Sequence, residues 1–187
     1  MLTQRAIKLL LLTFVRSGEL RGARWDEFDT KGKVWRIPSE RMKMGVEHLV
    51  PLSRQTLELL ELLKGMTGKY DLVFPSERDR SRERSDHTMR RAIFKLGYDG
   101  TEDGKSKAVP HGFRATACSI LNESGFNPDA IERQLAHQER NSVRAAYIHH
   151  ARFLDERHQM MQWWADYLDE MRVTGKVVPI FSKASNE

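Results

Sequence analysis

Residues 111–137 read HGFRATACSILNESGFNPDAIERQLAH and contain two consecutive helix signals. Apolar residues at helical spacing predict a helix from His111 to about Asn122, which ends near Gly125. The run NPD at 127–129 then places an N-cap, a first-position proline and an early acid in the order in which helices begin. The stretch therefore predicts two helices joined by a tight connection.

Four other segments show apolar residues at helical spacing, and they cover residues 3–15, 53–65, 88–96 and 154–171. The first of them is expected to bury one face and to bring Arg16 to its end. In the second, Ser53 fits the N-cap position, and Leu52 and Leu57 fit a hydrophobic staple. The apolar run at 177–181, after the last helix, is typical of a strand.

Two short segments rich in branched and aromatic residues, 34–37 and 47–52, predict β-strands. The polar, glycine-bearing stretch 39–45 between them predicts a β connection that carries Lys43. The expected fold class is therefore mainly α with a small antiparallel β-sheet, an α+β fold.

The composition indicates one ordinary domain with a modest basic excess. The 187 residues are 40% hydrophobic, and lysine plus arginine outnumber aspartate plus glutamate by 31 to 26, which gives a formal net charge of +5. This excess suits a polyanionic partner without requiring one. The charged run 76–86, SERDRSRERSD, is interpreted as an exposed loop. Arginines lying along a DNA backbone are the alternative.

The compartment is indicated by what the sequence lacks. Cys118 is a single cysteine, so no intramolecular disulfide framework exists and a reducing environment is expected. No stretch approaches ~18 uninterrupted apolar residues, and Arg5 and Lys8 interrupt the apolar opening segment. We therefore expect a cytoplasmic protein, without a signal peptide or a membrane partner, that associates with the nucleoid when it binds DNA.

Several cationic side chains suit chemistry on a phosphodiester. Negative charge grows on the non-bridging oxygens as a nucleophile attacks, so a catalyst needs fixed donors aimed at them. Arg16 and Arg114 are candidates because arginine stays charged and binds phosphate bidentately. His111 lies three residues before Arg114, and histidine suits proton transfer near neutral pH. Taken singly, Arg16 could also be a surface cation at a helix end, and His111 a local cap.

Five stretches together resemble the tyrosine recombinase, or phage integrase, family. They are TFVRSGELRGARWDEFD at 13–29, RMKMGVEHLVPL at 41–52, HGFRATACSILNESGF at 111–126, LAHQERNSVRAAY at 135–147 and the segment after Tyr147. In detail the chain is similar to the catalytic domain of a prophage or genomic-island integrase. One departure is Ala136, where the family often has glycine before its second histidine.

The resemblance implies a site-specific recombinase that cuts and rejoins DNA through a 3′-phosphotyrosine, for integration or excision of a prophage or genomic island. The catalytic residues that it implies are Arg16, Lys43, His111, Arg114, His137 and the nucleophile Tyr147. By the same resemblance, Glu19 would orient Arg16, with an exposed carboxylate as the alternative. Lys43 would protonate the departing 5′ oxygen. Because one diester replaces another, no ATP is expected. Because arginines can stabilise the phosphate charge, no metal ion or other cofactor is expected either.

The resemblance also implies an organisation and partners. Residues 1–187 would form a single catalytic domain, with a core at 1–150 and a tail helix and strand at 151–187. The family's arm-binding and core-binding domains are expected to be absent. Double-stranded DNA is the expected substrate, accessory DNA-bending proteins could take part, and the full-length protein would form a tetramer on DNA through the tail. The tail helix would dock on a neighbouring protomer or fold back on its own core, using Trp163, Trp164 and Leu168.

Two other functions are compatible with these residues. One is a type IB topoisomerase-like enzyme, which relaxes DNA with the same chemistry. The other is a catalytically silent DNA-binding module. A metal site is not expected, because no cysteine or paired carboxylate supports the histidines His149, His150 and His158.

Overall fold

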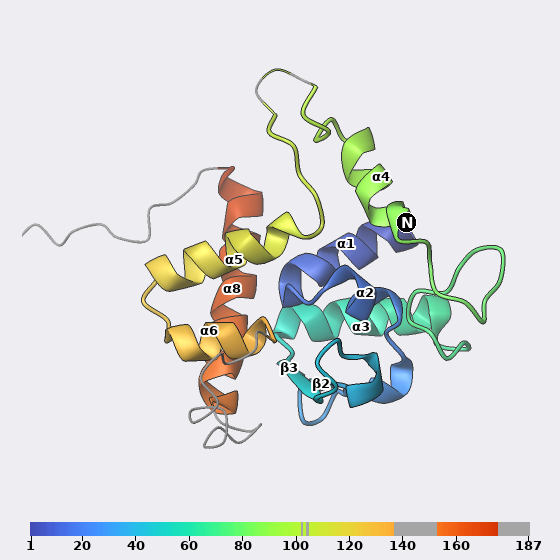
Figure 1. Ribbon diagram of the computed structural model, residues 1–187, viewed down its shortest axis with the longest axis horizontal. Coiled ribbons are helices and arrows are strands. Elements are labelled where there is room, and N and C mark those ends of the chain that lie inside the picture. Colours follow the sequence, from blue (N-terminus) through green and yellow to red (C-terminus); the bar gives the residue numbers. More distant parts are fainter. Residues whose placement is uncertain (102, 104, 137–152, 176–187) are drawn as a thin grey trace, which may run out of the picture.

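The computed structural model describes residues 1–136, except 102 and 104, and residues 153–175 (Figure 1). Its helices are α1 (Leu2–Thr13), α2 (Ser17–Arg21), α3 (Arg54–Thr67), α4 (His87–Lys95), α5 (Gly112–Glu123), α6 (Pro128–Gln134) and α8 (Leu154–Thr174). Two 3-10 helices are η1 (Trp25–Glu27) and η2 (Ser39–Arg41), and the strands are β1 (Phe28–Asp29), β2 (Val34–Ile37) and β3 (His48–Pro51). The expected fold class, mainly α with a small antiparallel sheet, is confirmed.

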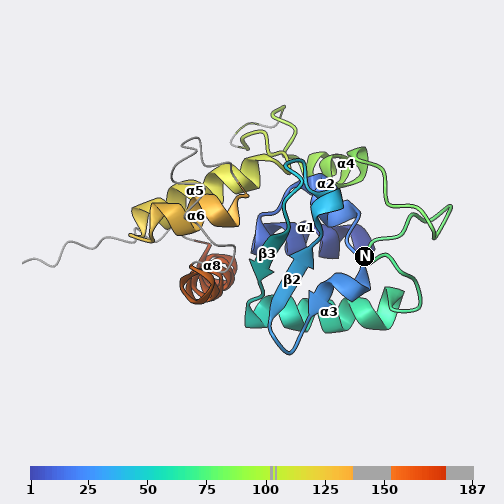
Figure 2. The ribbon, with the colours of Figure 1, turned by 60° about the horizontal axis from the view of Figure 1, so that its bottom comes forward.

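The three strands form one antiparallel sheet in the order β1-β2-β3 (Figure 2). Trp35 pairs with Val50 in one ladder and with Phe28 in the other. Its ring is fully buried and stacks on Phe28 with 4.9 Å between the ring centroids. Together with α1 and α3, the sheet encloses an apolar core that includes Leu9 and Leu63. This core fixes the connections that lead into and out of the sheet.

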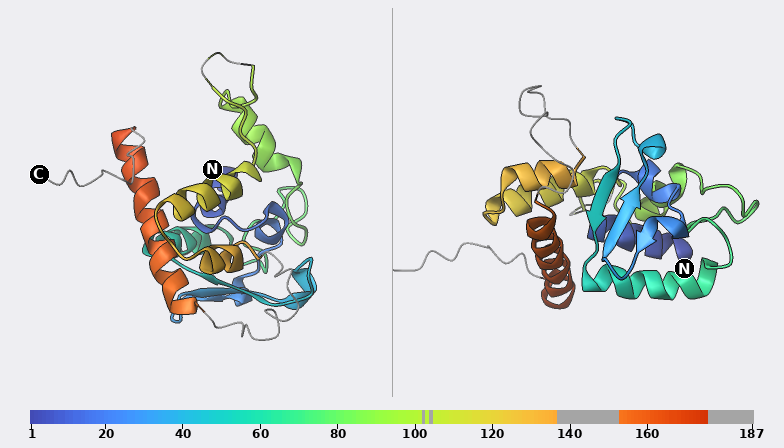
Figure 3. Two further views of the ribbon diagram at one scale, coloured as in Figure 1. Left: turned by 60° about the vertical axis from the view of Figure 1, so that its left-hand side comes forward. Right: turned by 90° about the horizontal axis from the view of Figure 1, so that it is seen from below.

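A second apolar cluster joins α5, α6 and α8 to the end of α1 (Figure 3). Phe14, directly after α1, meets Trp164 of α8 edge to face, with 6.0 Å between the ring centroids. The Trp164 indole also donates a hydrogen bond to the Leu11 carbonyl at 2.8 Å. Trp163 and Leu168 pack against the same cluster. Helix α8 therefore folds onto the core of its own chain.

The two helices predicted around residue 125 are present as α5 and α6. Gly125 adopts a φ of 81° between them, a left-handed conformation that glycine adopts without steric cost. The Asn127 side chain accepts a hydrogen bond from the Asp129 N–H at 3.0 Å, as the N-cap signal predicts. Strand β2 has the predicted bounds, and β3 lies within its predicted segment. None of the described helices is long and apolar enough to cross a lipid bilayer.

Two predicted helix ends and one strand need correction. Helix α1 ends at Thr13, because Phe14 adopts a left-handed φ of 37°. Arg16 therefore stands at the N-cap of α2 and not at the end of the first helix. Helix α3 continues past Gly65 to Thr67. Strand β1 has no counterpart among the predicted strands, and the strand-like run at 177–181 lies outside the described residues.

The charged run 76–86 is only partly an exposed loop. The Arg84 side chain is 11% exposed and donates a hydrogen bond to Thr3 Oγ1 at 3.0 Å. Arg21 of α2 forms an ion pair with Glu83 at 3.2 Å. These contacts attach the run to α1 and α2, so at least one of its arginines has a structural role.

Candidate active site

Glu19 accepts two hydrogen bonds from Arg16, three residues earlier. One comes from the Arg16 backbone N–H and the other from its Nη1, both at 2.8 Å. The backbone bond satisfies a free N–H at the start of α2, and the side-chain bond orients the guanidinium. Glu19 is 5% exposed and the Arg16 side chain 30% exposed. The pair therefore buries its anion and leaves its cation accessible.

The guanidinium of Arg114 lies between two helix ends. Its Nη1 donates to the Phe14 carbonyl at 2.7 Å, and its Nη2 donates to the Leu135 carbonyl at 2.6 Å. Arg114 is on the first turn of α5 and is only 4% exposed. Carbonyls at helix C-termini carry partial negative charge, which offsets the cost of burying this cation. Burial, and to a lesser extent the charge of Arg16, lowers the pKa of Arg114.

Arg16 and Arg114 meet at the end of α6. Arg16 Nη2 donates to the carbonyl of Ala136 at 3.1 Å, and Ala136 directly follows Leu135. Ala136 has a φ of 49°, so the chain leaves the helix direction at this point. A guanidinium has five N–H donors, so both groups can hold these carbonyls and still offer donors to a ligand. The arrangement gathers two fixed cations for one anionic group.

Lys43 and His111 are both exposed at the surface. His111 occupies the N-cap of α5, and Lys43 lies on the connection between η2 and β3. Neither side chain forms a hydrogen bond or ion pair with the two arginines within the described residues. The lysine connection is anchored by Arg41, whose guanidinium binds the Glu19 carbonyl and the Glu27 carboxylate. Lys43 therefore follows, by two residues, a side chain that is bound to α2.

Several predicted residues lie outside the part of the chain that the structure describes. They are His137, Tyr147, His149 and His150. His158 is on α8, where burial lowers its pKa. Among the described residues, no three histidine, cysteine or carboxylate side chains gather as they would around a metal ion.

A buried polar cluster behind the arginines was missed from the sequence. It consists of His48 on β3, Gln134 at the end of α6 and Arg157 on α8. Burial, followed by the charge of Arg157, lowers the pKa of His48 to about 3, so this imidazole is neutral at physiological pH. One signal was available: Leu154, Met161 and Trp164 form an apolar stripe, and residue 157 falls on the same helix face.

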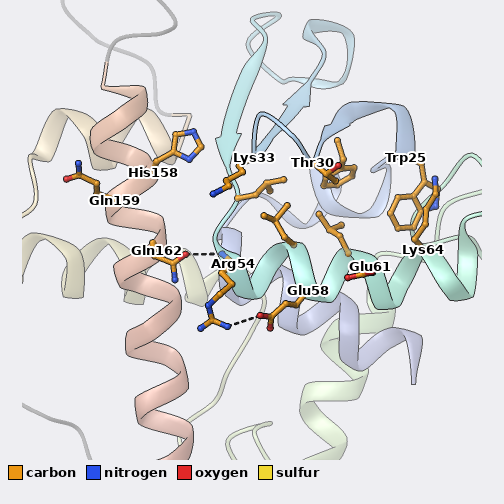
Figure 4. Close-up of a pocket in the computed structure, with 14 residues that line it drawn as sticks. Trp25, Thr30, Lys33, Arg54, Glu58, Glu61, Lys64, His158, Gln159 and Gln162 are labelled. Atoms are coloured by element: carbon orange, nitrogen blue, oxygen red, sulfur yellow. Dashed lines mark hydrogen bonds and ion pairs between the residues drawn. The ribbon is translucent and has the colours of Figure 1, made fainter.

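A groove of about 1090 Å³ lies elsewhere, between α3, the turn around β1 and β2, and α8 (Figure 4). Lys64 lies over the Trp25 ring at 4.6 Å from its centroid. At the other end, Arg54 pairs with Glu58 at 2.8 Å, and its backbone N–H donates to Gln162 at 2.9 Å. None of the predicted catalytic residues that the structure describes lines this groove.

Comparison with known proteins gives matches over most of the chain. Residues 1–152 match the model of the phage integrase family. The integrase of Enterobacteria phage P4 is 52% identical over 184 residues, which cover 91% of this chain and 41% of that protein. Putative protein IntB of Escherichia coli is 47% identical over 184 residues, which cover 91% of this chain and 46% of that protein. The chain thus spans less than half the length of these two relatives.

Two solved structures share the fold at low sequence identity. An integrase from mycobacterium phage Brujita superimposes with a TM-score of 0.62 at 16% identity, over 86% of this chain and 50% of that one. The Tn1549 transposon integrase, solved in complex with transposon right end DNA, gives a TM-score of 0.59 at 17% identity. That match covers 92% of this chain and 58% of the other. The arrangement of helices around a small sheet is therefore shared with both.

Proposed function

Because the chain belongs to the phage integrase family, we propose that it is the catalytic domain of a site-specific DNA recombinase that integrates or excises a prophage or genomic island. The observation that carries the proposal is the binding of Arg16 and Arg114 to the adjacent carbonyls of Ala136 and Leu135. Two guanidinium groups fixed at one place suit the two non-bridging oxygens of one phosphate. His137, the next residue of the chain, would add a third donor.

In the proposed reaction, the phenol oxygen of Tyr147 attacks phosphorus and the bond from phosphorus to the 5′ oxygen breaks. His111 takes the phenol proton, and Lys43 gives a proton to the departing 5′ oxygen. The products are a 3′-phosphotyrosine and a free 5′ hydroxyl. In the second step a 5′ hydroxyl attacks the phosphotyrosine and regenerates the phenol. Each step exchanges one phosphodiester for another, so the energy of the bond is conserved.

Arg41 supports the assignment of Lys43 to this reaction. Its guanidinium holds the Glu19 carbonyl, and Glu19 in turn holds the Arg16 guanidinium. The lysine connection and the first arginine are therefore attached to the same short helix. From this position the exposed Lys43 side chain would extend to the phosphate held by Arg16.

A basic projection supports DNA as the partner. Helix α4 packs on α1 through Met89, and its far end and the connection to α5 extend away from the two apolar cores (Figure 1). They carry exposed basic side chains, namely Arg90, Arg91, Lys95, Lys105 and Lys107. We propose that this projection lies along the duplex and adds phosphate contacts to those of the catalytic arginines. The DNA complex of the Tn1549 transposon integrase agrees with this partner.

The larger assembly is also a proposal. Residues 1–150 would be the catalytic core, and 151–187 the tail through which copies form a tetramer on DNA, with accessory DNA-bending proteins where the site requires them. Within the described residues α8 covers its own core, so we propose that this helix does not supply the whole contact with a neighbouring copy.

The chemistry can be tested with a pool of nicked duplexes of randomised sequence. Cleavage near the nick releases a short strand whose 5′ hydroxyl would be needed for rejoining, so its loss traps the covalent adduct. Wild-type protein should form a protein–DNA adduct that resists denaturant. Tyr147→Phe should form none, because it lacks the attacking oxygen. Tyr70→Phe, at a partly exposed tyrosine after α3 and outside the basic projection, is the control and should keep the adduct. An adduct of equal yield in Tyr147→Phe would remove the proposed nucleophile.

DNA binding is tested separately by the dependence of affinity on salt. Log affinity should fall linearly with log salt concentration, with a slope of about −0.9 per neutralised phosphate. A flat response would contradict the assignment of DNA. Salt-dependent binding without any adduct would indicate a silent DNA-binding module, and relaxation of supercoiled plasmid without strand exchange would indicate a topoisomerase.

A further inference from the structure

Arg157 is a buried cation whose partners, among the described residues, are uncharged. The residue is 1% exposed on the inner face of α8. Its Nη2 and Nε donate to Gln134 Oε1 at 2.6 Å and 3.2 Å, and its Nη2 also donates to the Leu49 carbonyl. Burial lowers the pKa of Arg157 to about 9, so the group is still charged at neutral pH.

An apolar side chain at this position would be the simpler solution for stability. Position 157 belongs to the apolar stripe of α8, and a buried guanidinium without a carboxylate partner carries a large desolvation cost. Replacing such groups by well-packed apolar residues is often neutral or stabilising in other proteins. The packing of α8 therefore does not account for an arginine here, whereas its hydrogen bonds do.

Those hydrogen bonds lead to the ends of two helices. Gln134, the last residue of α6, accepts from Arg157 and donates through Nε2 to the Thr13 carbonyl at 3.2 Å. Thr13 is the last residue of α1. The Gln134 side chain thus ties the end of α1 to the end of α6, and Arg157 holds that side chain in place from α8.

The carbonyls next to these ties are the ones that hold the catalytic arginines. Phe14 follows Thr13 and accepts from Arg114 at 2.7 Å, and Leu135 follows Gln134 and accepts from Arg114 at 2.6 Å. Ala136 accepts from Arg16 at 3.1 Å. Phe14 and Ala136 both have positive φ, which is uncommon for residues other than glycine and needs support from the surroundings.

We infer that Arg157 is a positioning residue: through Gln134 it sets the relative placement of the α1 and α6 ends, and those ends orient Arg16 and Arg114. The inference rests on the proposed function, because it assigns these arginines to the phosphate. Arg157 does not touch the phosphate itself. Its loss should misplace the two guanidinium groups while leaving the basic surface that binds DNA unchanged.

The placement of the arginines can be followed without DNA. In protein labelled with ¹⁵N in arginine side chains, the signals of the two guanidinium groups are assigned by Arg16→Lys and Arg114→Lys. Arg157→Met should shift both signals and speed the solvent exchange of the Arg114 N–H groups. Gln134→Met should do the same, and the double variant should add little, because both changes break one connection.

Covalent adduct formation with the nicked duplex pool gives the second readout. Arg157→Met should lower the single-turnover rate about 10- to 100-fold, since a misplacement of about 1 Å can cost that much. The dissociation constant for DNA should change less than about twofold. Leu63→Ala is the matched control: it is equally buried but lies on α3, in the other apolar core, which contains neither Phe14 nor Leu135. It should lower Tm and leave the arginine signals and the rate per folded molecule unchanged.

Two results would overturn the inference. One is an Arg157→Met protein with lowered Tm and unchanged arginine signals, since the residue would then serve packing alone. The other, for use if Arg157→Met does not fold, is Arg157→Lys with wild-type signals, because lysine cannot reproduce the two-point contact with Gln134. If the wild-type protein forms no adduct, but the arginine signals shift in the Arg157 and Gln134 variants as expected, the proposed function would be contradicted and the positioning role of Arg157 would stand.

Discussion

Arg16 and Arg114 donate to the carbonyls of two consecutive residues at the end of α6, and Arg114 also reaches the end of α1. The acceptors are backbone atoms, so the orientation of both cations depends on where two helices end. Of these two arginines, only Arg16 forms an ion pair with a carboxylate within the described residues, and its partner is Glu19. Helix ends can therefore do for Arg114 what a buried acid does for Arg16.

Replacing Arg114 by lysine should abolish most of the activity while the protein keeps its fold. A lysine ammonium cannot hold the Phe14 and Leu135 carbonyls and also present a planar fork to phosphate. Loss of one such donor costs about 100- to 1,000-fold in rate. The measurement is the single-turnover rate of adduct formation. Arg54→Lys, at an exposed arginine of the groove that contains no catalytic residue, should stay close to wild type, and an Arg114→Lys protein with the wild-type rate would contradict the assignment.

Glu19→Gln should affect both stability and cleavage. The amide has the size of the carboxylate, but it lacks the negative charge that holds Arg16. One of the two oxygens that accept hydrogen bonds from Arg16 is also replaced by an NH2 group, which cannot accept one. We expect a loss of about 1–3 kcal/mol in the free energy of unfolding, measured in urea, and a slower adduct formation. Glu58→Gln, which breaks the exposed pair with Arg54, should leave both quantities unchanged. Equal effects of the two substitutions would show that the Glu19–Arg16 pair contributes no more than an exposed ion pair.

His48 should make the protein sensitive to mild acid. Its pKa is about 3 in the folded state and ordinarily 6.5, so between these values the unfolded chain binds a proton that the folded chain does not. Stability is then complete above pH 6.5 and falls as the pH drops toward 3, by at most about 1.4 kcal/mol per pH unit from this group. Urea unfolding at several pH values should give a shallower dependence for His48→Gln than for wild type. Parallel curves would exclude this role.

The contribution of the α6 N-cap to stability can be measured by comparing Asn127 with a second asparagine, Asn122, that caps no helix start. Asn127→Ala removes the side-chain acceptor of the Asp129 N–H and should cost about 1 kcal/mol of stability. Asn122, exposed on the last turn of α5, caps no helix start; its amide donates to the carbonyl and Sγ of Cys118, and Asn122→Ala should be neutral or slightly stabilising. Because α6 ends in the carbonyls that hold the arginines, Asn127→Ala should also slow adduct formation. A larger effect from Asn122→Ala would refute the capping argument.

Local signals predicted the elements well, because they act within a few residues. The NPD run at 127–129 predicted α6, and the branched and aromatic residues at 34–37 predicted β2. The end of α1 was misplaced because Phe14 adopts a left-handed conformation in which its ring packs on Trp164, 150 positions away in the sequence, and no local signal indicates such a contact. Arg84 was taken as solvated because nothing near it in the chain shows that Thr3 would cover it.

The sequence by itself determined the longer helices, the strands β2 and β3, the family, and the identity of the residues proposed for the phosphate, since spacing and residue type are enough for these. Only the tertiary structure decided how Arg16 and Arg114 are held and which residue stands behind them. Their acceptors are carbonyls, which every residue possesses and which leave no mark in a sequence. The role of Gln134 and Arg157 can be seen only in the folded chain, where α1, α6 and α8 bring the Arg157 guanidinium, the Gln134 amide and two helix ends together.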